Sequence, residues 1–472
     1  MHDKLIVQDG PRWSDRITLR NVHEIFLQME EAEDLFGLRT GDGTYYWDIV
    51  RRNVLIGVHG LHGGGFAPPA LAPPSLVSTA KHFVKPALNR LTRRYVAGRA
   101  PKYIFITGQR ISRGSDLFDP VADHLYDLLG EDAIAVELMN KTAISYSDIV
   151  RGRKTRIPPV AVGATVEPKD LPRIVDSIGS AVHKHFGISF SAHSVVLDAM
   201  ATFEANRDYY RRLFAEHRPK AVVCIDNATL KGLFSAAKEM EIPTLELQHA
   251  EINRRNLGYS YPKSVSSSHP GLALPTALLT FSEYWNDVVH FPTRTVSSIG
   301  NDYFYQERVP ARDDDILMVS AYHYHEALIE LAHALAELIG QRRIYYKLHP
   351  HQFVDKTAIV QACRSKSNIV VVSDELDLSE LLKRCDHVVG VHSTVTYIAL
   401  QAGKKVCIYK RANYFCHDDI FEYVELFDNA SELREIIDAP PGKYFSNLST
   451  LPLFFKPFDA RRFMQAIERV AP

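Results

Sequence analysis

Short runs of consecutive apolar residues alternate with longer amphipathic stretches along most of the chain. The runs occupy residues 103–107, 133–137, 221–226, 244–249, 278–281 and 295–299 in the first half, and 316–320, 344–348, 369–373, 387–391 and 406–409 in the second. Apolar runs of this length are typical of parallel strands that helices cover on both faces. The alternation of strand and helix therefore predicts an α/β fold with two doubly wound, Rossmann-like sheets.

The length of the chain requires more than one hydrophobic core. It has 472 residues, 46% of them hydrophobic, whereas a single core stops growing near ~250–300 residues. An acidic, proline-containing stretch at 309–315 separates the two series of strands and marks a linker. We therefore predict a first domain over 1–308, with an N-terminal extension and a glycine- and proline-rich loop at 57–74. A second domain follows over 309–457, and an amphipathic helix in 458–472 crosses back to the first domain.

Composition argues against several classes of protein. The 55 basic and 56 acidic residues leave a net charge of -1, so no overall field attracts nucleic acid. The 5 cysteines are odd in number and lack CxxC spacing, which argues against disulfides or zinc and favours a reducing, cytoplasmic location. No apolar run approaches the ~20 residues of a membrane span, and the N-terminus lacks the apolar core of a signal peptide.

Residues 81–102 carry several basic side chains and no acidic one. Their apolar residues recur at helical spacing, which predicts a helix with one apolar and one cationic face. A solvated helix packed on the core is one interpretation of this pattern. Peripheral contact with the anionic inner face of a membrane is the other.

Polar residues follow two predicted strands of the second half. Lys347, His349 and Pro350 end one strand, and Ser393 and Thr394 follow another. Ligands of open α/β sheets bind beyond the carboxyl ends of the strands. Ser393 and Thr394 also open the next predicted helix, whose N-terminus favours an anion such as a phosphate. Helix capping alone also accounts for serine and threonine at this place.

The second half resembles a known group of enzymes through three motifs. These are Lys347-Leu-His-Pro350, Gly390-Val-His-Ser-Thr394 and Ala399-Leu-Gln-Ala-Gly-Lys-Lys-Val406. Together they are similar to the donor domain of bacterial GT-B glycosyltransferases with a His-Pro motif. That group includes capsule and lipopolysaccharide sialyl- and Kdo-transferases and is related to the CDP-glycerol glycerophosphotransferases. The resemblance implies a GT-B fold with a nucleotide-sugar donor in an interdomain cleft.

One position departs from that group. Where the group commonly has an acid that contacts the ribose, this sequence has Gln401. An amide can still hydrogen-bond a hydroxyl group. Tyr322 and His323, which follow the strand at 316–320, are further candidates for donor contact.

The first half is expected to provide a general base. Asp226 and His249 each end a predicted strand, and an acceptor hydroxyl must lose a proton to such a group as it attacks. The stretch around His249 resembles the Gln-His-Gly region of the glycerophosphotransferases, where the histidine is implicated as a base, with Ala250 in place of glycine. Asp226 and His249 stay equal candidates, and Glu251 is a third.

These features predict a glycosyltransferase of bacterial capsule or lipopolysaccharide O-antigen synthesis. It would move a sugar from a nucleotide-sugar donor, CMP-activated rather than UDP-activated, to a hydroxyl of a free or lipid-linked glycan. No cofactor is expected, and no metal, because Asp313, Asp314 and Asp315 precede their strand and read as a solvated linker. The alternatives are a CDP-polyol phosphotransferase of the same architecture and a non-catalytic, two-lobed nucleotide or sugar binding protein.

Overall fold

The computed structural model describes residues 21–41, 43–61, 101–107, 111–113, 116–138, 154–157, 169–308, 310–321, 324–373, 375–391, 393–410, 418–440 and 447–471. Three regions of the sequence predictions lie wholly or mostly outside these residues. They are the pair Tyr322 and His323, nearly all of the basic stretch 81–102, and most of the loop 57–74.

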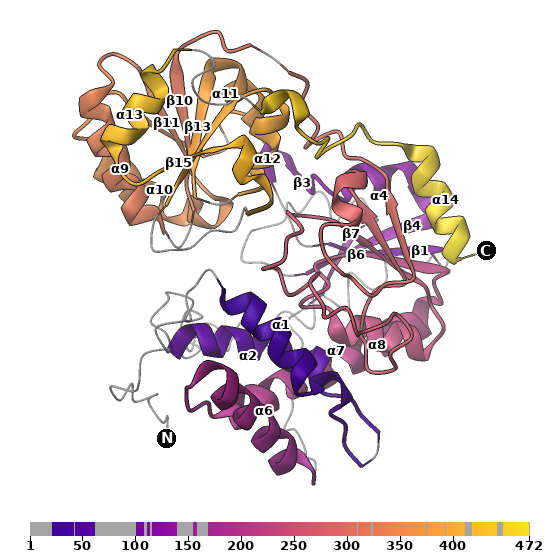
Figure 1. Ribbon diagram of the computed structural model, residues 1–472. Coiled ribbons are helices and arrows are strands. Elements are labelled where there is room, and N and C mark those ends of the chain that lie inside the picture. The colour runs from indigo at the N-terminus through magenta and orange to yellow at the C-terminus, as the bar shows by residue number, and fades with distance from the viewer. Residues whose placement is uncertain are drawn as a thin grey trace, which may run out of the picture.

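Seven parallel strands form the first sheet (Figure 1), in the order β5-β4-β1-β6-β7-β8-β9. They are β1 (Tyr103–Thr107), β4 (Ala133–Leu138), β5 (Lys154–Ile157), β6 (Ala221–Ile225), β7 (Thr244–Leu247), β8 (Ala277–Thr280) and β9 (Thr295–Ser298). Counted along the chain, the first six strands have the order 3-2-1-4-5-6 of a Rossmann sheet. Helices α4 (Asp123–Leu129) and α8 (Lys231–Glu239) belong to this domain, and a small hairpin pairs β2 (Ile111–Arg113) with β3 (Asp116–Phe118).

The second sheet repeats this topology with six parallel strands in the order β12-β11-β10-β13-β14-β15. They are β10 (Asp315–Val319), β11 (Ile344–Lys347), β12 (Ile369–Val372), β13 (Cys385–Gly390), β14 (Lys405–Tyr409) and β15 (Glu425–Phe427). Its helices are α9 (His325–Leu338), α10 (Lys356–Cys363), α11 (Leu378–Arg384), α12 (Thr394–Gln401) and α13 (Ala430–Asp438). The protein therefore has the predicted GT-B architecture of two Rossmann-like domains.

The last helix lies against the first domain, although it follows the second in sequence. Helix α14 (Ala460–Val470) packs against β8 and β9, at the edge of the first domain in Figure 1. The side chain of Asp459 caps it by accepting a hydrogen bond from the backbone N–H of Arg462 at 3.0 Å. The domain boundaries proposed from the sequence stay predictions.

Four helices form a separate layer beside the first sheet (Figure 1). They are α1 (Val22–Ala32), α2 (Trp47–Leu61), α6 (Leu171–Phe186) and α7 (Ala192–His217), and they share one hydrophobic core. None of the helices within the described ranges is long and apolar enough to cross a membrane. Short 3₁₀ turns complete the fold at η1 (Leu35–Gly37), η2 (Gly130–Asp132), η3 (Glu283–Asn286), η5 (Pro350–Asp355), η6 (Asp418–Tyr423) and η7 (Leu448–Thr450).

Two expectations from the sequence are wrong. Residues 57–61 belong to helix α2 and not to a loop. A Cβ atom at Gly57 would lie 2.6 Å from the ring of Phe190, which would have to shift. Asp315 is not part of a solvated linker. It begins β10, is buried, and accepts a hydrogen bond at 3.0 Å from Nε of Arg343.

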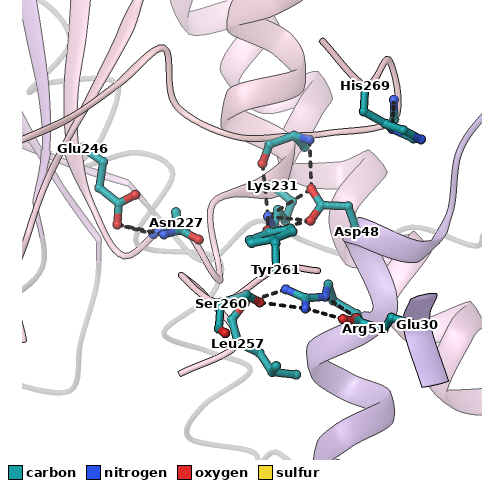
Figure 2. Close-up of polar contacts among 12 residues, drawn as sticks. Glu30, Asp48, Arg51, Asn227, Lys231, Glu246, Leu257, Ser260, Tyr261 and His269 are labelled. Carbon is teal, nitrogen blue, oxygen red and sulfur yellow. Dashed lines mark hydrogen bonds and ion pairs between the residues drawn. The ribbon is translucent and has the colours of Figure 1, made fainter. Parts of the chain in front are cut away.

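A buried ion pair joins helices α1 and α2 of the layer, and its arginine also bonds the segment that follows β7. The Arg51 guanidinium lies 2.6 Å and 2.8 Å from the two carboxylate oxygens of Glu30 and also donates to the carbonyl groups of Leu257 and Ser260 (Figure 2). Both charged groups are buried, so each charge is stabilised by the opposite charge of its partner instead of by water. Arg51 thereby fixes the chain segment that follows β7.

A second buried pair connects the helical layer to α8 of the first domain. The Lys231 ammonium lies 3.0 Å from the Asp48 carboxylate and also donates to the Tyr261 hydroxyl and the Ala273 carbonyl (Figure 2). Burial lowers the pKa of Lys231, and the neighbouring Asp48 opposes this shift. Helix α2 is therefore bonded to α8 and to the segment that contains Tyr261.

Replacing Arg51 with methionine tests the importance of this layer. The substitution leaves the Glu30 carboxylate buried without its counter-charge, so we expect a loss of about 3–5 kcal/mol in the free energy of unfolding. The double variant Arg51→Met/Glu30→Gln should recover part of this loss, because no unpaired charge stays buried. Denaturant titration measures both; a loss below about 1 kcal/mol for the single variant would show that the pair contributes little.

Candidate functional site

Candidate residues of the two domains meet in a direct contact. The Thr394 hydroxyl donates a hydrogen bond of 2.7 Å to Oε2 of Glu251. Thr394 is the first residue of α12 in the second domain, and Glu251 follows β7 in the first. Figure 1 shows α12 on the side of the second domain nearest the first. The predicted phosphate side and the predicted base side are therefore within hydrogen-bond distance of each other.

The N-terminus of α12 is capped by the residue before it. Oγ of Ser393 accepts a hydrogen bond of 3.2 Å from the backbone N–H of Val395, in an extended conformation typical of an N-cap. The capping interpretation of Ser393 is thus confirmed. A phosphate contact by Ser393 and Thr394 stays a prediction.

Asp226 and His249 lie at the carboxyl edge of the first sheet, next to Glu251. Asp226 has a left-handed backbone (φ 66°), and its carboxylate accepts a hydrogen bond of 2.9 Å from the hydroxyl of Thr229. Burial lowers the pKa of His249, and the negative charges of Asp226 and Glu251 oppose that shift. Nδ1 of His249 is buried and has no hydrogen-bond partner among the described residues. A neutral imidazole of this kind can accept a proton.

Glu246 is a buried carboxyl group that the sequence analysis missed. Its Oε1 atom accepts hydrogen bonds from the Tyr259 hydroxyl at 2.7 Å and from the backbone and side-chain N–H groups of Asn227, both at 3.1 Å; Figure 2 shows the Asn227 contact. Burial raises the pKa of Glu246 to about 7, against the effect of these hydrogen bonds. Because Asn227 follows Asp226 directly, Glu246 holds the turn that carries Asp226. Its signal in the sequence is an acid between Leu245 and Leu247, within an apolar strand.

A second polar bridge between the domains involves another missed acid, Asp419. Tyr284 of η3 donates from its hydroxyl to Oδ2 of Asp419 at 2.6 Å, and Tyr397 of α12 donates to both carboxylate oxygens, at 2.9 Å and 3.0 Å. Burial raises the pKa of Asp419, and the two phenol hydroxyls oppose the shift. Asp419 does not end a strand, so a search of strand ends could not find it.

On the donor side, Lys347 and His349 occupy the end of β11. The Lys347 ammonium donates to the Ser373 carbonyl at 2.7 Å, which gives it a structural role. The backbone N–H of His349 donates to Oε1 of Gln352 at 2.9 Å, where η5 begins at Pro350. The imidazole of His349 is half-buried. Binding of the donor by these residues stays a prediction.

Gln401 has a structural partner in the chain that returns to the first domain. Its side-chain N–H donates to the Phe455 carbonyl at 2.9 Å, and its carbonyl oxygen accepts from the Phe455 backbone N–H at 2.7 Å. The side chain is buried. This pair of bonds explains why an amide, with both a donor and an acceptor, is suited to the position. A ribose contact by Gln401 stays a prediction.

The sequence matches no protein-family model and no curated protein. Among solved structures it is similar to MurG of Acinetobacter baumannii, with 12% identity, 78% of this chain and 99% of that chain covered, and a TM-score of 0.42. It is also similar to a UDP-GlcNAc 2-epimerase of Neisseria meningitidis bound to UDP-GlcNAc, with 12% identity, 78% of this chain and 99% of that chain covered, and a TM-score of 0.42. For a glycosyltransferase of Rickettsia africae the identity is 14%, the covered shares are 79% of this chain and 93% of that chain, and the TM-score is 0.39. The similarity concerns the fold alone, and none of the three is identified as a sialyl- or Kdo-transferase.

The raised pKa of Glu246 predicts how stability depends on pH. A carboxyl group whose pKa is raised by folding binds its proton more tightly in the folded state, so its contribution to stability is lost as pH rises. With a pKa of about 7 in place of 4.5, the wild type should lose about 3 kcal/mol relative to Glu246→Gln between pH 4 and pH 8. Denaturant titrations of both proteins across this range measure the difference. Parallel pH profiles would contradict the assignment.

Proposed function

We propose that the protein is a glycosyltransferase that moves a sugar from a nucleotide-sugar donor to a hydroxyl of a glycan acceptor. The observation that carries the proposal is the 2.7 Å hydrogen bond between Thr394 and Glu251. It joins the helix N-terminus suited to a phosphate with the carboxyl edge that carries three candidate bases. A transfer reaction needs these two functions within the length of one bound substrate pair.

In the proposed reaction the acceptor hydroxyl approaches from the first domain. Its oxygen forms a bond to the anomeric carbon of the sugar while the bond from that carbon to the phosphate oxygen breaks. The hydroxyl proton passes to a base, and the electron pair of the broken bond leaves with the nucleotide. Among Asp226, His249 and Glu251, we favour His249. Its lowered pKa keeps the ring unprotonated, and its buried Nδ1 has no hydrogen-bond partner among the described residues.

The finer assignments rest on the sequence motifs. The resemblance at His349, Pro350, Ser393 and Thr394 favours a CMP-activated sugar over a UDP-activated one, without a metal. It also supports a role in bacterial capsule or lipopolysaccharide O-antigen synthesis. We place the protein in the cytoplasm, and the basic stretch 81–102 is a candidate for contact with the inner face of the membrane, beside the alternative of a solvated helix.

Nucleotide binding tests the donor assignment. A nucleotide that binds the folded protein raises its melting temperature by mass action, and at saturating CMP we expect an increase of about 3 °C or more. CDP, UDP and GDP should have smaller effects. The variant His349→Ala should lose the CMP response, whereas His183→Ala, which removes an exposed histidine on α6, should keep it. A CMP response that survives His349→Ala would contradict the donor site.

Turnover tests the choice of base. If His249 takes the proton, His249→Ala should lower kcat by about 10²–10⁴-fold, and Asp226→Asn should have a smaller effect. Product analysis gives a second readout: release of CMP with a glycosidic product supports the proposal, whereas a phosphodiester product supports a CDP-polyol phosphotransferase. If His249→Ala and Asp226→Asn both leave turnover intact, neither residue is the base.

A further inference from the structure

The contact between Glu251 and Thr394 has a chemical limit. A threonine hydroxyl has one hydrogen to donate, and here that hydrogen points to the Glu251 carboxylate at 2.7 Å. A phosphate oxygen that accepts a hydrogen bond from the same hydroxyl would have to replace the Glu251 carboxylate as the acceptor. Two anions held beside one hydroxyl also repel each other, most strongly where the surroundings exclude water.

The same helix end favours both anions for the same reason. Thr394 is the first residue of α12, where the backbone N–H groups and the helix dipole stabilise negative charge. The Glu251 carboxylate is the anion that lies there in this structure. We infer that Glu251 and the phosphate of an incoming nucleotide compete for Thr394, so that donor binding displaces Glu251 from α12 toward the acceptor side. This inference rests on the proposed function, because it assumes that the phosphate binds at Thr394.

The neighbouring contacts indicate that Glu251 moves without separation of the domains. One turn further along α12, Tyr397 bonds Asp419, and Asp419 also bonds Tyr284 of the first domain. Trp285 packs on Tyr397 with ring centroids 5.0 Å apart, and its indole N–H donates to the Phe454 carbonyl at 2.6 Å. These aromatic groups are mostly buried, whereas Glu251 and Thr394 are each half-buried. The bond between Glu251 and Thr394 is therefore the part of this interface that a ligand can open most easily.

Competition of this kind would set the order of substrate binding. While Glu251 is bonded to Thr394, its carboxylate is turned to the second domain. Once a phosphate takes over the Thr394 hydroxyl, Glu251 is released beside His249, whose pKa already responds to its charge. The Glu251 carboxylate would then turn toward the acceptor side only after the donor is bound.

Calorimetric titration of the full chain with CMP tests the competition, with cytidine as the probe that lacks a phosphate. If Glu251 occupies Thr394 in nine-tenths of the molecules, Glu251→Ala should bind CMP about tenfold more tightly than the wild type. Glu251→Gln should also bind CMP more tightly, because it removes the repulsion between the two anions. Cytidine affinity should not change in either variant. Glu337→Gln, which alters an exposed ion pair between Glu337 of α9 and Lys366, should behave as the wild type.

The outcomes separate the two claims. If the wild type binds CMP and both Glu251 variants bind it with unchanged or lower affinity, the competition does not exist, although the donor assignment stands. If Glu251→Ala does not fold, Glu251→Gln alone decides, since it keeps the size of the side chain. If neither the wild type nor any variant binds CMP, CDP, UDP or GDP, the proposed function is wrong and the competition falls with it.

Discussion

The rest of the structure depends on the burial of Trp285 at the junction of the two domains, which holds the domains in their relative positions. Its ring packs against Tyr397 of α12 and against Phe454 and Phe455 of the returning chain. The hydrophobic core around it is continuous from the first sheet into one face of the second. Burying an aromatic side chain of this size contributes on the order of 2–3 kcal/mol. The two domains therefore share one hydrophobic core. This shared core fixes the positions of the site residues that face each other across the junction.

Hydrogen bonds at this apolar junction fix the orientation of the two domains relative to each other. The Gln401 amide fixes the backbone of Phe455 from both sides, and the Asp419 carboxylate collects two tyrosine hydroxyls, one from each domain. Both groups are more than half buried, where an unpaired polar atom is costly. Their geometry is consequently specific, and α12 is held with its N-terminus toward the first domain. The position of Thr394 opposite Glu251 follows from these bonds.

The periodicity of apolar residues was sufficient to predict the two sheets, since every predicted strand is present in the structure. It missed β5, because Lys154-Thr-Arg-Ile157 is an edge strand with little apolar surface, and β15, because three residues are too few to form a recognisable run. The assembly of α1, α2, α6 and α7 into one layer was not predicted, for a different reason. Its stability depends on buried pairs between residues far apart in sequence, such as Arg51 with Glu30 and Lys231 with Asp48, and a linear pattern does not contain these pairings.

Some residues of the candidate site could also be predicted from the sequence, and others could not. Residues at strand ends, such as Asp226, His249 and Thr394, could be identified because the topology of a Rossmann sheet places them at one edge. Glu246 lies within a strand and Asp419 in the 3₁₀ turn η6, so only the folded structure brings them to the site. Sequence also could not distinguish a phosphate ligand from a structural group at Lys347 and Gln401, because burial and partners decide that difference.

A crystal structure of the full chain grown with CMP would show directly which anion is bound to Thr394. We expect the CMP phosphate within hydrogen-bond distance of the Thr394 hydroxyl, the nucleotide beside His349, and the Glu251 carboxylate moved away from α12. A nucleotide bound elsewhere, or one bound with the Glu251 to Thr394 hydrogen bond intact, would contradict it.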